Sequence, residues 1–249
     1  MTDAPARPLR PPLLDARLST ALTLAGRCET AADIGADHGR LSAVLLAQGL
    51  AAHVLVADVS EKALAKARGR ICALHLEGGA TFAVADGLDA LEALAQKKAD
   101  VIFILGMGGD TLRGILLRGH ARLQNAALIL GAQTELPLLR QTVCELGYRI
   151  RREALALEGG RCYELMRCEP ALPGEMPYTE EELLLGPVLL YEHPPLYGGV
   201  LLRRENLLRE AIRAMEAADL RKDRERLSCF RRELAYVERA LQTCGEACK

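Results

Sequence analysis

Apolar runs alternate with segments of helical periodicity up to about residue 168. Each short run is typical of a strand buried on both faces, and each following segment repeats its apolar residues at helical spacing. This alternation predicts a parallel sheet covered by helices on both faces. The expected strands are 31–35, 53–58, 80–85, 99–105 and 126–132, and the expected helices between them are 39–49, 61–76, 88–95, 109–119 and 135–146.

Two further apolar segments, 148–157 and 161–168, follow each other without a helix between them. The intervening Glu158-Gly159-Gly160 is typical of a β-hairpin turn. A series of βα units closed by a hairpin, with the last strand inserted antiparallel, is the layout of the class I methyltransferase fold. A dinucleotide-binding fold would more often continue the alternation. We therefore expect an α/β, Rossmann-like class I fold of the kind that uses S-adenosylmethionine (SAM).

The pattern changes at 169–177, where three prolines and a glycine indicate a linker. Residues 179–191 are predicted to be helical, with three glutamates in the first turn, where the helix dipole favours them. The segments 201–216 and 219–242 are long, charged and periodic. One face of the first has Leu201, Leu208, Ile212 and Met215, and a mostly seven-spaced stripe on the second has Leu220, Leu227, Leu234, Val237 and Leu241. These segments predict an antiparallel helical hairpin with coiled-coil packing. The expected parts are a methyltransferase domain over 1–168, the linker over 169–177 and a helical coiled-coil domain over 178–249.

Residues 31–42, AADIGADHGRLS, have the strand, glycine turn and helix start of a nucleotide-type ligand loop. The glycines let backbone approach a ligand closely, and the helix start offers unpaired N–H groups. The spacing departs from the dinucleotide fingerprint and fits the Asp-x-Gly-x-Gly-x-Gly of SAM enzymes, with Asp37 at the middle glycine. The candidate cofactor-binding residues here are Asp33, Gly35, Asp37, His38 and Gly39.

The polar residues of this loop have alternative interpretations. Asp33 most simply holds the loop by accepting backbone N–H groups, or it contacts the methionine end of SAM through water. The carboxylate of Asp37 would hold the ammonium group of that methionine. The same carboxylate would repel the negatively charged pyrophosphate of a dinucleotide. Alternatively, Asp37 caps the helix that starts near His38. His38 is either a turn residue or a substrate contact.

Acidic residues end the next two predicted strands. Asp58, followed by Val59, is suited to accept hydrogen bonds from both ribose hydroxyls. The alternative is that Asp58 caps the next helix, although Ser60 already suits that task. Asp86 could accept a hydrogen bond from the adenine amine, with Gly87 keeping the turn tight, or it could serve the turn alone.

Gly106, Met107, Gly108 and Gly109 follow the fourth predicted strand and directly precede a helix. Three glycines in four residues imply close backbone approach, beside the switch point where open α/β sheets bind ligands. In nucleobase methyltransferases the corresponding loop faces the target base. We therefore expect these four residues on the acceptor side of the site, with Met107 either in the core or forming a soft wall against a base.

Composition and motifs limit the types of reaction that we expect of this chain. The 249 residues carry a net charge of −1, and we find no Ser/His/Asp set, P-loop or strong metal motif in the sequence. Such a chain suits transfer of an already activated methyl group, because the protein then mainly has to align donor and acceptor. No segment approaches the length of a membrane span, so we expect a cytoplasmic protein.

Eight cysteines without CxxC spacing favour reduced cytosolic thiols. A zinc site that includes Cys244 and Cys248 is the weaker alternative, and we expect no metal. Basic residues could contact RNA phosphates, although on long helices such charges more often form a solvated face. They are Arg113, Arg118, Arg122, Arg149, Arg151 and Arg152, together with the six basic residues of 221–232.

The motifs DIGADH (33–38) and GMGG (106–109), with the LGY and EGGRCYE elements of 146–164, resemble the bacterial tRNA (adenine-22-N1)-methyltransferases, the TrmK family. The resemblance runs from about residue 14, where the segment 14–18 is similar to the family's first helix, to about residue 241. It implies SAM as the cofactor, tRNA as the partner and a coiled-coil appendage that helps to hold tRNA. It gives no reason to expect a membrane or a protein partner.

One position departs from the family pattern. After Asp-His the family often has Ala-Tyr-Leu, whereas this chain has Gly39-Arg40-Leu41. A cation replaces an aromatic ring that could stack on a base, so we include Arg40 among the candidate catalytic residues. The expected acceptor is N1 of a tRNA adenine, with position 22 resting on the resemblance. A same-fold methyltransferase with another substrate and a non-catalytic SAM- or RNA-binding protein are the alternatives.

Overall fold

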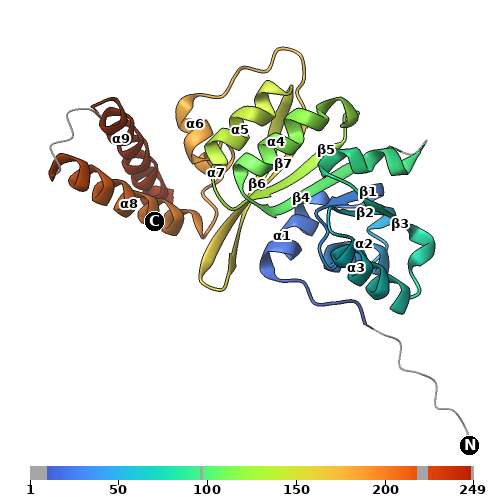
Figure 1. The fold of residues 1–249 in the computed structure, drawn as a ribbon. Coiled ribbons are helices and arrows are strands. Elements are labelled where there is room, and N and C mark those ends of the chain that lie inside the picture. Colours follow the sequence, from blue (N-terminus) through green and yellow to red (C-terminus); the bar gives the residue numbers. More distant parts are fainter. Residues whose placement is uncertain (1–9, 96–97, 218–223, 248–249) are drawn as a thin grey trace, which may run out of the picture.

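The computed structural model describes residues 10–95, 98–217 and 224–247. Within these residues, seven strands form one sheet in the order β3-β2-β1-β4-β5-β7-β6 (Figure 1). The first five strands are parallel, whereas β7 runs antiparallel to both β5 and β6. The strands are β1 (Cys28–Ile34), β2 (Ala51–Asp58), β3 (Ala80–Val84), β4 (Val101–Met107), β5 (Ala127–Ala132), β6 (Tyr148–Glu158) and β7 (Arg161–Pro170).

Helices cover both faces of this sheet. One face carries α1 (Ala16–Ala25), α2 (Arg40–Ala47) and α3 (Glu61–Ala73), with the short 3-10 helix η1 (Glu77–Gly79) before β3. The other face carries α4 (Gly109–Gly119), α5 (Leu136–Glu145) and the 3-10 helices η2 (Gly87–Leu94) and η3 (His120–Arg122). The chain then continues through α6 (Glu180–Leu185), α7 (Leu189–Glu192), α8 (Tyr197–Ala217) and α9 (Arg224–Ala247).

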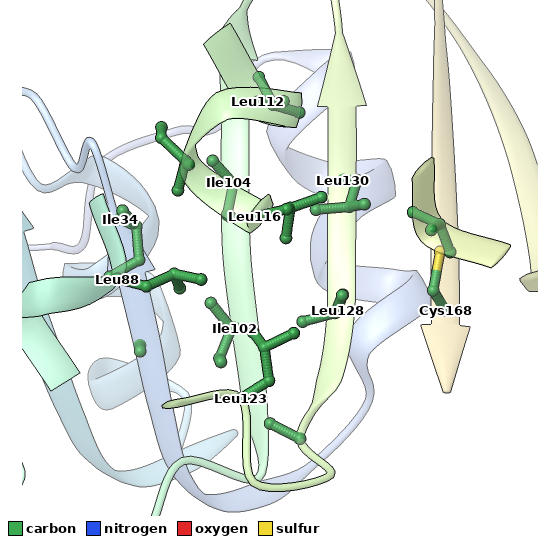
Figure 2. Packing of buried hydrophobic residues seen from close by; sticks show 14 of the residues in the cluster. Ile34, Leu88, Ile102, Ile104, Leu112, Leu116, Leu123, Leu128, Leu130 and Cys168 are labelled. Atoms are coloured by element: carbon green, nitrogen blue, oxygen red, sulfur yellow. The ribbon is translucent and has the colours of Figure 1, made fainter. Parts of the chain in front are cut away.

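The central strand β4 shows how the apolar runs produce this layering. Ile102 and Ile104 belong to the core under α4, while Val101 and Phe103 belong to the core under α1 and α2. All four are at most 3% exposed, because successive side chains of a strand point to opposite faces. Figure 2 shows Ile102 and Ile104 between Leu88 and the leucines of α4 and β5. Burying each of these side chains contributes about 1.5–3 kcal/mol.

Two predicted helices differ from what forms. The segment predicted at 88–95 is the 3-10 helix η2, and the segment predicted at 179–191 is divided into α6 and α7. The division falls at Gly186, whose φ is +95°. A Cβ there would lie 2.9 Å from both Arg140 Nη2 and Glu153 Oε2, so only glycine lets the chain pass this pair. Pro187 follows and cannot donate the next helical hydrogen bond.

The helices α8 and α9 pack against each other as an antiparallel pair that projects from the sheet (Figure 1). Their buried residues include the predicted Leu201, Leu208 and Ile212 on α8 and Val237 on α9. The predicted Leu220 lies outside the described residues. In the part of the chain that the structure describes, no helix combines the length and apolarity needed to cross a membrane.

The free thiols among the described residues include Cys28, Cys72, Cys144, Cys162, Cys168 and Cys229. Burial raises the pKa of Cys28 to about 11, and it also raises the pKa values of Cys144 and Cys168. Cys72 on α3 and Cys229 on α9 are exposed. Of the two residues of the alternative zinc site, Cys244 is buried and Cys248 lies outside the described residues.

A buried charge network joins the sheet to the helical part. The guanidinium of Arg140, on α5, donates to Glu153 Oε1 on β6 at 2.9 Å and to Glu164 Oε2 on β7 at 2.7 Å. Its third contact is the carbonyl of Leu183 in α6, at 3.3 Å. The second oxygen of Glu153 accepts the backbone N–H groups of Val188 and Leu189, which begin α7. One cation therefore holds α5, the hairpin and the start of the helical part together.

Replacing Arg140 with alanine should cost about 3–5 kcal/mol of unfolding free energy, because Glu153 would remain charged, buried and unpaired. The side chains of this pair are 0% and 1% exposed. Urea denaturation measures the loss. Arg231→Ala is the control: its pair with Glu216 is 60% and 46% exposed, so it should cost at most about 1 kcal/mol. Equal small losses for both variants would show that the buried network does not stabilise the fold.

Candidate active site

A cavity of about 400 Å³ lies at the carboxyl ends of the parallel strands, beside the switch point between β1 and β4. This is within the usual size range of small-molecule sites, and it is the place where open α/β sheets bind ligands. Six of the residues predicted from the sequence line it, namely Gly35, Asp58, Val59, Asp86, Gly87 and Met107. The structure therefore brings together residues from the ends of β1, β2, β3 and β4.

Gly35 and Met107 meet across the switch point. Gly35 has a φ of +73°, and a Cβ built on it would lie 2.2 Å from Met107 Cε. Any side chain at position 35 would therefore be strained and would also displace Met107. The half-buried Met107 forms part of the cavity wall, as a soft residue placed against a ligand would.

The carboxylate of Asp58 organises the turn on which it lies. One oxygen accepts the N–H of Asp37 at 3.0 Å, and the other accepts the N–H of Ser60 at 2.8 Å. Each carboxylate oxygen has a further lone pair, so both can still accept a ligand hydroxyl. The cap of α3 is Ser60, whose hydroxyl accepts the N–H of Ala63 at 3.2 Å. The alternative of Asp58 as that cap is therefore wrong.

Asp86 lies at the opposite end of the cavity and is paired with Arg118 of α4. Their closest N–O distance is 3.1 Å, and both side chains are more than 60% exposed. Such a pair contributes little and can open for a ligand. Gly87, with φ +57°, lies against Ile115, whose Cγ2 would be 2.9 Å from a Cβ at position 87. This contact explains the tight turn.

Asp37, His38 and Gly39 are not among the residues that line the cavity. Asp37 is 71% exposed in its side chain and lies 2.5 Å from His38 Nδ1, whose ring also approaches Lys66 at 3.1 Å. Gly39 is the N-cap of α2 and receives no side-chain hydrogen bond, so the interpretation of Asp37 as a helix cap is wrong. Gly39 instead allows α2 to approach α3, because a Cβ there would lie 2.7 Å from that of Ala67.

Asp33 lies beneath the cavity and is only 6% exposed. Its carboxylate accepts the hydroxyl hydrogen of Ser42 at 2.5 Å, which joins β1 to α2. Burial raises the pKa of Asp33 to about 6, and the negative charge of Asp58 adds to this effect. The Ser42 hydrogen bond acts in the opposite direction. This contact favours the loop-holding interpretation of Asp33.

The glycine loop after β4 has two sides. Met107 faces the cavity, whereas Gly106, with φ +80°, faces α1: a Cβ there would lie 2.8 Å from Arg17 Nη1. The side chain of Gln133 donates to the Gly106 carbonyl at 2.8 Å. Gly109 leaves no room for a side chain, because a Cβ would lie 2.4 Å from the carbonyl oxygen of Thr134, and Gly108 caps α4.

Arg40 is not among the cavity-lining residues. Its guanidinium contacts Asp15 at 3.4 Å and the carbonyl of Leu13, so it ties the start of α2 to the segment before α1. Five of the ten predicted basic residues that the structure describes also pair with carboxylates, Arg118 among them. Arg122 contacts Asp89 and Glu92, Arg151 contacts Glu175, Arg231 contacts Glu216 and Arg232 contacts Glu180, while 221–223 lie outside the described residues.

The sequence reasoning missed one wall of the cavity. It is a single face of α4, formed by Asp110, Thr111, Gly114, Ile115 and Arg118. Positions 110, 114 and 118 recur at four-residue spacing, so the predicted helix 109–119 already held this signal. Arg17 and Gln133, on the other side of the loop, had no comparable signal because they come from distant parts of the chain.

The family model described as "Methyltransferase domain" matches residues 14–166. A Mycoplasma pneumoniae protein, named provisionally as a tRNA methyltransferase, is 30% identical over 158 residues, which cover 64% of this chain and 71% of that protein. The Bacillus subtilis tRNA (adenine(22)-N(1))-methyltransferase is 27% identical over 157 residues, which cover 63% of this chain and 65% of that enzyme. The chain therefore spans just under two thirds of the length of the B. subtilis relative.

Solved structures show the same fold over most of the chain. A Streptococcus pneumoniae protein in complex with S-adenosyl-L-methionine, named provisionally as a tRNA (m1A22) methyltransferase, superimposes with a TM-score of 0.79. The match covers 92% of this chain and 100% of that one, at 23% identity. At this identity the similarity establishes the fold alone. The predicted Rossmann-like methyltransferase fold with a helical C-terminal part is confirmed.

The raised pKa of Asp33 predicts a pH-dependent gain in stability for Asp33→Asn. Folding favours the protonated carboxyl, so its contribution is complete below the ordinary value of 3.8 and is lost as pH rises through about 6. An asparagine stays neutral. The variant should therefore gain unfolding free energy relative to the parent between about pH 4 and pH 7, by about 3 kcal/mol at most.

Urea denaturation of both proteins across this pH range measures the difference. Asp110→Asn is the matched control, because it makes the same substitution at an exposed position outside the buried core. A stability difference for Asp33→Asn that stays constant with pH would contradict the prediction.

Proposed function

We propose that this chain, which belongs to the methyltransferase-domain family and within it to the tRNA (adenine-22-N1)-methyltransferases, transfers a methyl group from SAM to N1 of an adenine in tRNA, at position 22. The observation that carries the proposal is the cavity at the switch point, where Gly35, Asp58, Asp86 and Met107 converge from four strand ends. The name of the B. subtilis relative supports the substrate and the position.

The residues of the cavity fit SAM. Asp58 keeps free lone pairs for the two ribose hydroxyls, and Asp86 can exchange its exposed Arg118 partner for the adenine amine. Gly35, which has no room for a side chain, lets backbone lie against the ligand. When bound, SAM supplies an activated methyl group. We further propose that Val59 and Gly87 complete this site and that Asp33, Asp37, His38 and Gly39 shape the loop beside it.

The acceptor makes few chemical demands on the protein. Neutral adenine has a free lone pair at N1, so no residue has to remove a proton before transfer. The task of the chain is then to align the acceptor nitrogen with the donor and to exclude water. We assign Gly106, Met107, Gly108 and Gly109 to this alignment, because the loop they form separates the cofactor cavity from Arg17 and Gln133. Arg40 would act indirectly, by positioning the segment before α1.

The N1 atom lies on the Watson–Crick edge, so the adenine has to be unpaired or flipped out of its helix. A tRNA needs contacts beyond one base, and we propose that the helical domain over 178–249 provides some of them, after a methyltransferase domain over 1–168 and a linker over 169–177. A tRNA substrate would place the protein in the cytoplasm.

Incubating the protein with SAM and unmodified tRNA should yield 1-methyladenosine. Digestion of the tRNA and mass spectrometry of its nucleosides identify the product, and a tRNA whose position 22 is not adenine is the control. Binding should also weaken steeply with rising salt, as phosphate contacts require. A methylated guanosine or cytidine without 1-methyladenosine would refute the proposed acceptor, and the absence of any methylated nucleoside would refute the activity on tRNA.

Asp58→Ala should weaken SAM binding by about 1–3 kcal/mol, because two ligand hydroxyls would lose their acceptor. Isothermal titration calorimetry measures the affinity, and circular dichroism checks that the variant is folded. The matched control is Asp89→Ala, an exposed carboxylate paired with Arg122 and not among the residues that line the cavity. Unchanged affinity in a folded Asp58→Ala protein would remove Asp58 from the ribose-binding role.

A further inference from the structure

A second and larger cavity, a groove of about 800 Å³, lies between the sheet and the helical part. One wall is the tip of the β6–β7 hairpin with Arg161 and Tyr163, and the opposite wall is α8 with Arg203. Its inner end is formed by Gln133, which directly follows β5. Gln133 also donates to the carbonyl of Gly106. Gln133 therefore links the groove to the glycine loop through one hydrogen bond, although residues 106–109 do not line the groove themselves.

The two walls carry cations without acidic partners among the described residues. Arg161 donates to the backbone carbonyl of Gln133 at 2.9 Å and lies over the ring of Tyr163 at 5.1 Å. Arg203 is exposed and has no ion pair in the described part of the chain. By contrast, its neighbour Arg204 is paired with Glu233 at 2.7 Å. The groove is thus lined by two cations without an ion pair in the described residues, which come from separate elements.

The carboxylate that lines the groove forms no ion pair with either of these cations. Glu164 binds the buried Arg140 through Oε2 at 2.7 Å, and since Arg140 also pairs with Glu153, this network keeps one net negative charge beside the groove. Among the described residues of α8, Arg209 pairs with Glu238, whereas the exposed Arg213 outside the groove forms no ion pair, like Arg203. The groove differs from the rest of this surface because two such cations line one cavity from separate elements, which points to an anionic occupant.

Aromatic and apolar surface lies between the two cations. Tyr163 is half-buried, and the guanidinium of Arg17 approaches its ring at 5.8 Å from the side of the glycine loop. Large apolar side chains that are 36–59% exposed also line the groove, namely Leu157 on the hairpin, Leu196 just before α8 and Leu207 on α8. Cations that bind phosphates, combined with an aromatic platform for bases, are the chemistry with which proteins hold single-stranded nucleic acid.

We propose that this groove binds the RNA strand that flanks the target base, with Arg161 and Arg203 on its phosphates and Tyr163 stacked against an unpaired base. The proposal rests on the proposed function, because Gln133 joins the groove to the loop that would face the acceptor. It also specifies which part of the hairpin and which face of α8 contact the RNA. An acidic peptide would satisfy the two cations but would leave the stacking platform without a partner.

The test measures the affinity of the full-length protein for unmodified tRNA over a range of salt concentrations. Arg161→Ala and Arg203→Ala should each bind several-fold more weakly and should lower the slope of log K against log salt by about one, as expected for one lost phosphate contact. Arg213→Ala is the matched control, since Arg213 is an exposed residue of the same helix that does not line the groove. Calorimetry with SAM should give the parent affinity for all three variants.

Variants of Tyr163 test the contribution of base stacking separately from that of charge. Tyr163→Ala should weaken tRNA binding about five-fold or more without changing the salt slope, and Tyr163→Phe, which keeps the ring, should restore it. An equal loss in both variants, or a loss in Arg213→Ala as large as that in Arg203→Ala, would overturn the proposal. So would unchanged salt slopes for Arg161→Ala and Arg203→Ala.

The outcome is distinguishable from failure of the proposed function. If the parent protein forms 1-methyladenosine and the groove variants bind and methylate tRNA normally, the groove assignment alone is wrong. The second case is that the parent protein binds tRNA with the expected salt dependence, the groove variants bind it more weakly, and no 1-methyladenosine forms. The groove assignment then stands, and the acceptor assignment is wrong.

Discussion

The buried guanidinium of Arg140 is the constraint on which the arrangement of the molecule depends. A charge removed from water has to be matched by partners at close range, and Arg140 finds them on three separate elements. Burial by itself would lower its pKa, but Glu153 and Glu164 outweigh this effect and raise it above the ordinary value. Arg140 therefore stays protonated, and its hydrogen bonds hold Glu153, Glu164 and the Leu183 carbonyl in place.

This network sets the geometry of the groove as well as the stability of the fold. Glu153 directs its second oxygen to the first N–H groups of α7, and Gly186 provides the space for that approach. The hydroxyl of Tyr197, at the start of α8, then donates to the carbonyl of Leu185 at 3.0 Å. The helical part is therefore fixed at its base to the hairpin, which places Arg203 opposite Arg161. Farther along, α8 and α9 pack through a buried apolar cluster that includes Leu201, Leu208 and Val237.

The sequence predicted the sheet well because its central strands are buried on both faces and therefore appear as continuous apolar runs. It also identified Asp58, Asp86 and the two glycine loops, since parallel strands bring their carboxyl ends to one edge. It could not predict the break at Gly186, which arises from contact with Arg140 and Glu153, more than thirty residues away. Arg140 itself looked like an ordinary charged position on an amphipathic helix. The partners of Arg40 and of the arginines in the tail depend likewise on tertiary contacts that no local pattern encodes.

The burial of most thiols gives the molecule a chemical asymmetry. Cys28, Cys144, Cys162 and Cys168 have pKa values raised by burial and are poor nucleophiles, while Cys72 on α3 and Cys229 on α9 are exposed. One exposed thiol is thus present on the sheet layer and one on the projecting helices, while Cys28, Cys144 and Cys162 are partly exposed. With these three and Cys248, which lies outside the described residues, replaced by serine, a maleimide donor and acceptor dye pair would attach at Cys72 and Cys229. Energy transfer between the dyes would then report directly whether the helical part moves relative to the sheet when RNA binds.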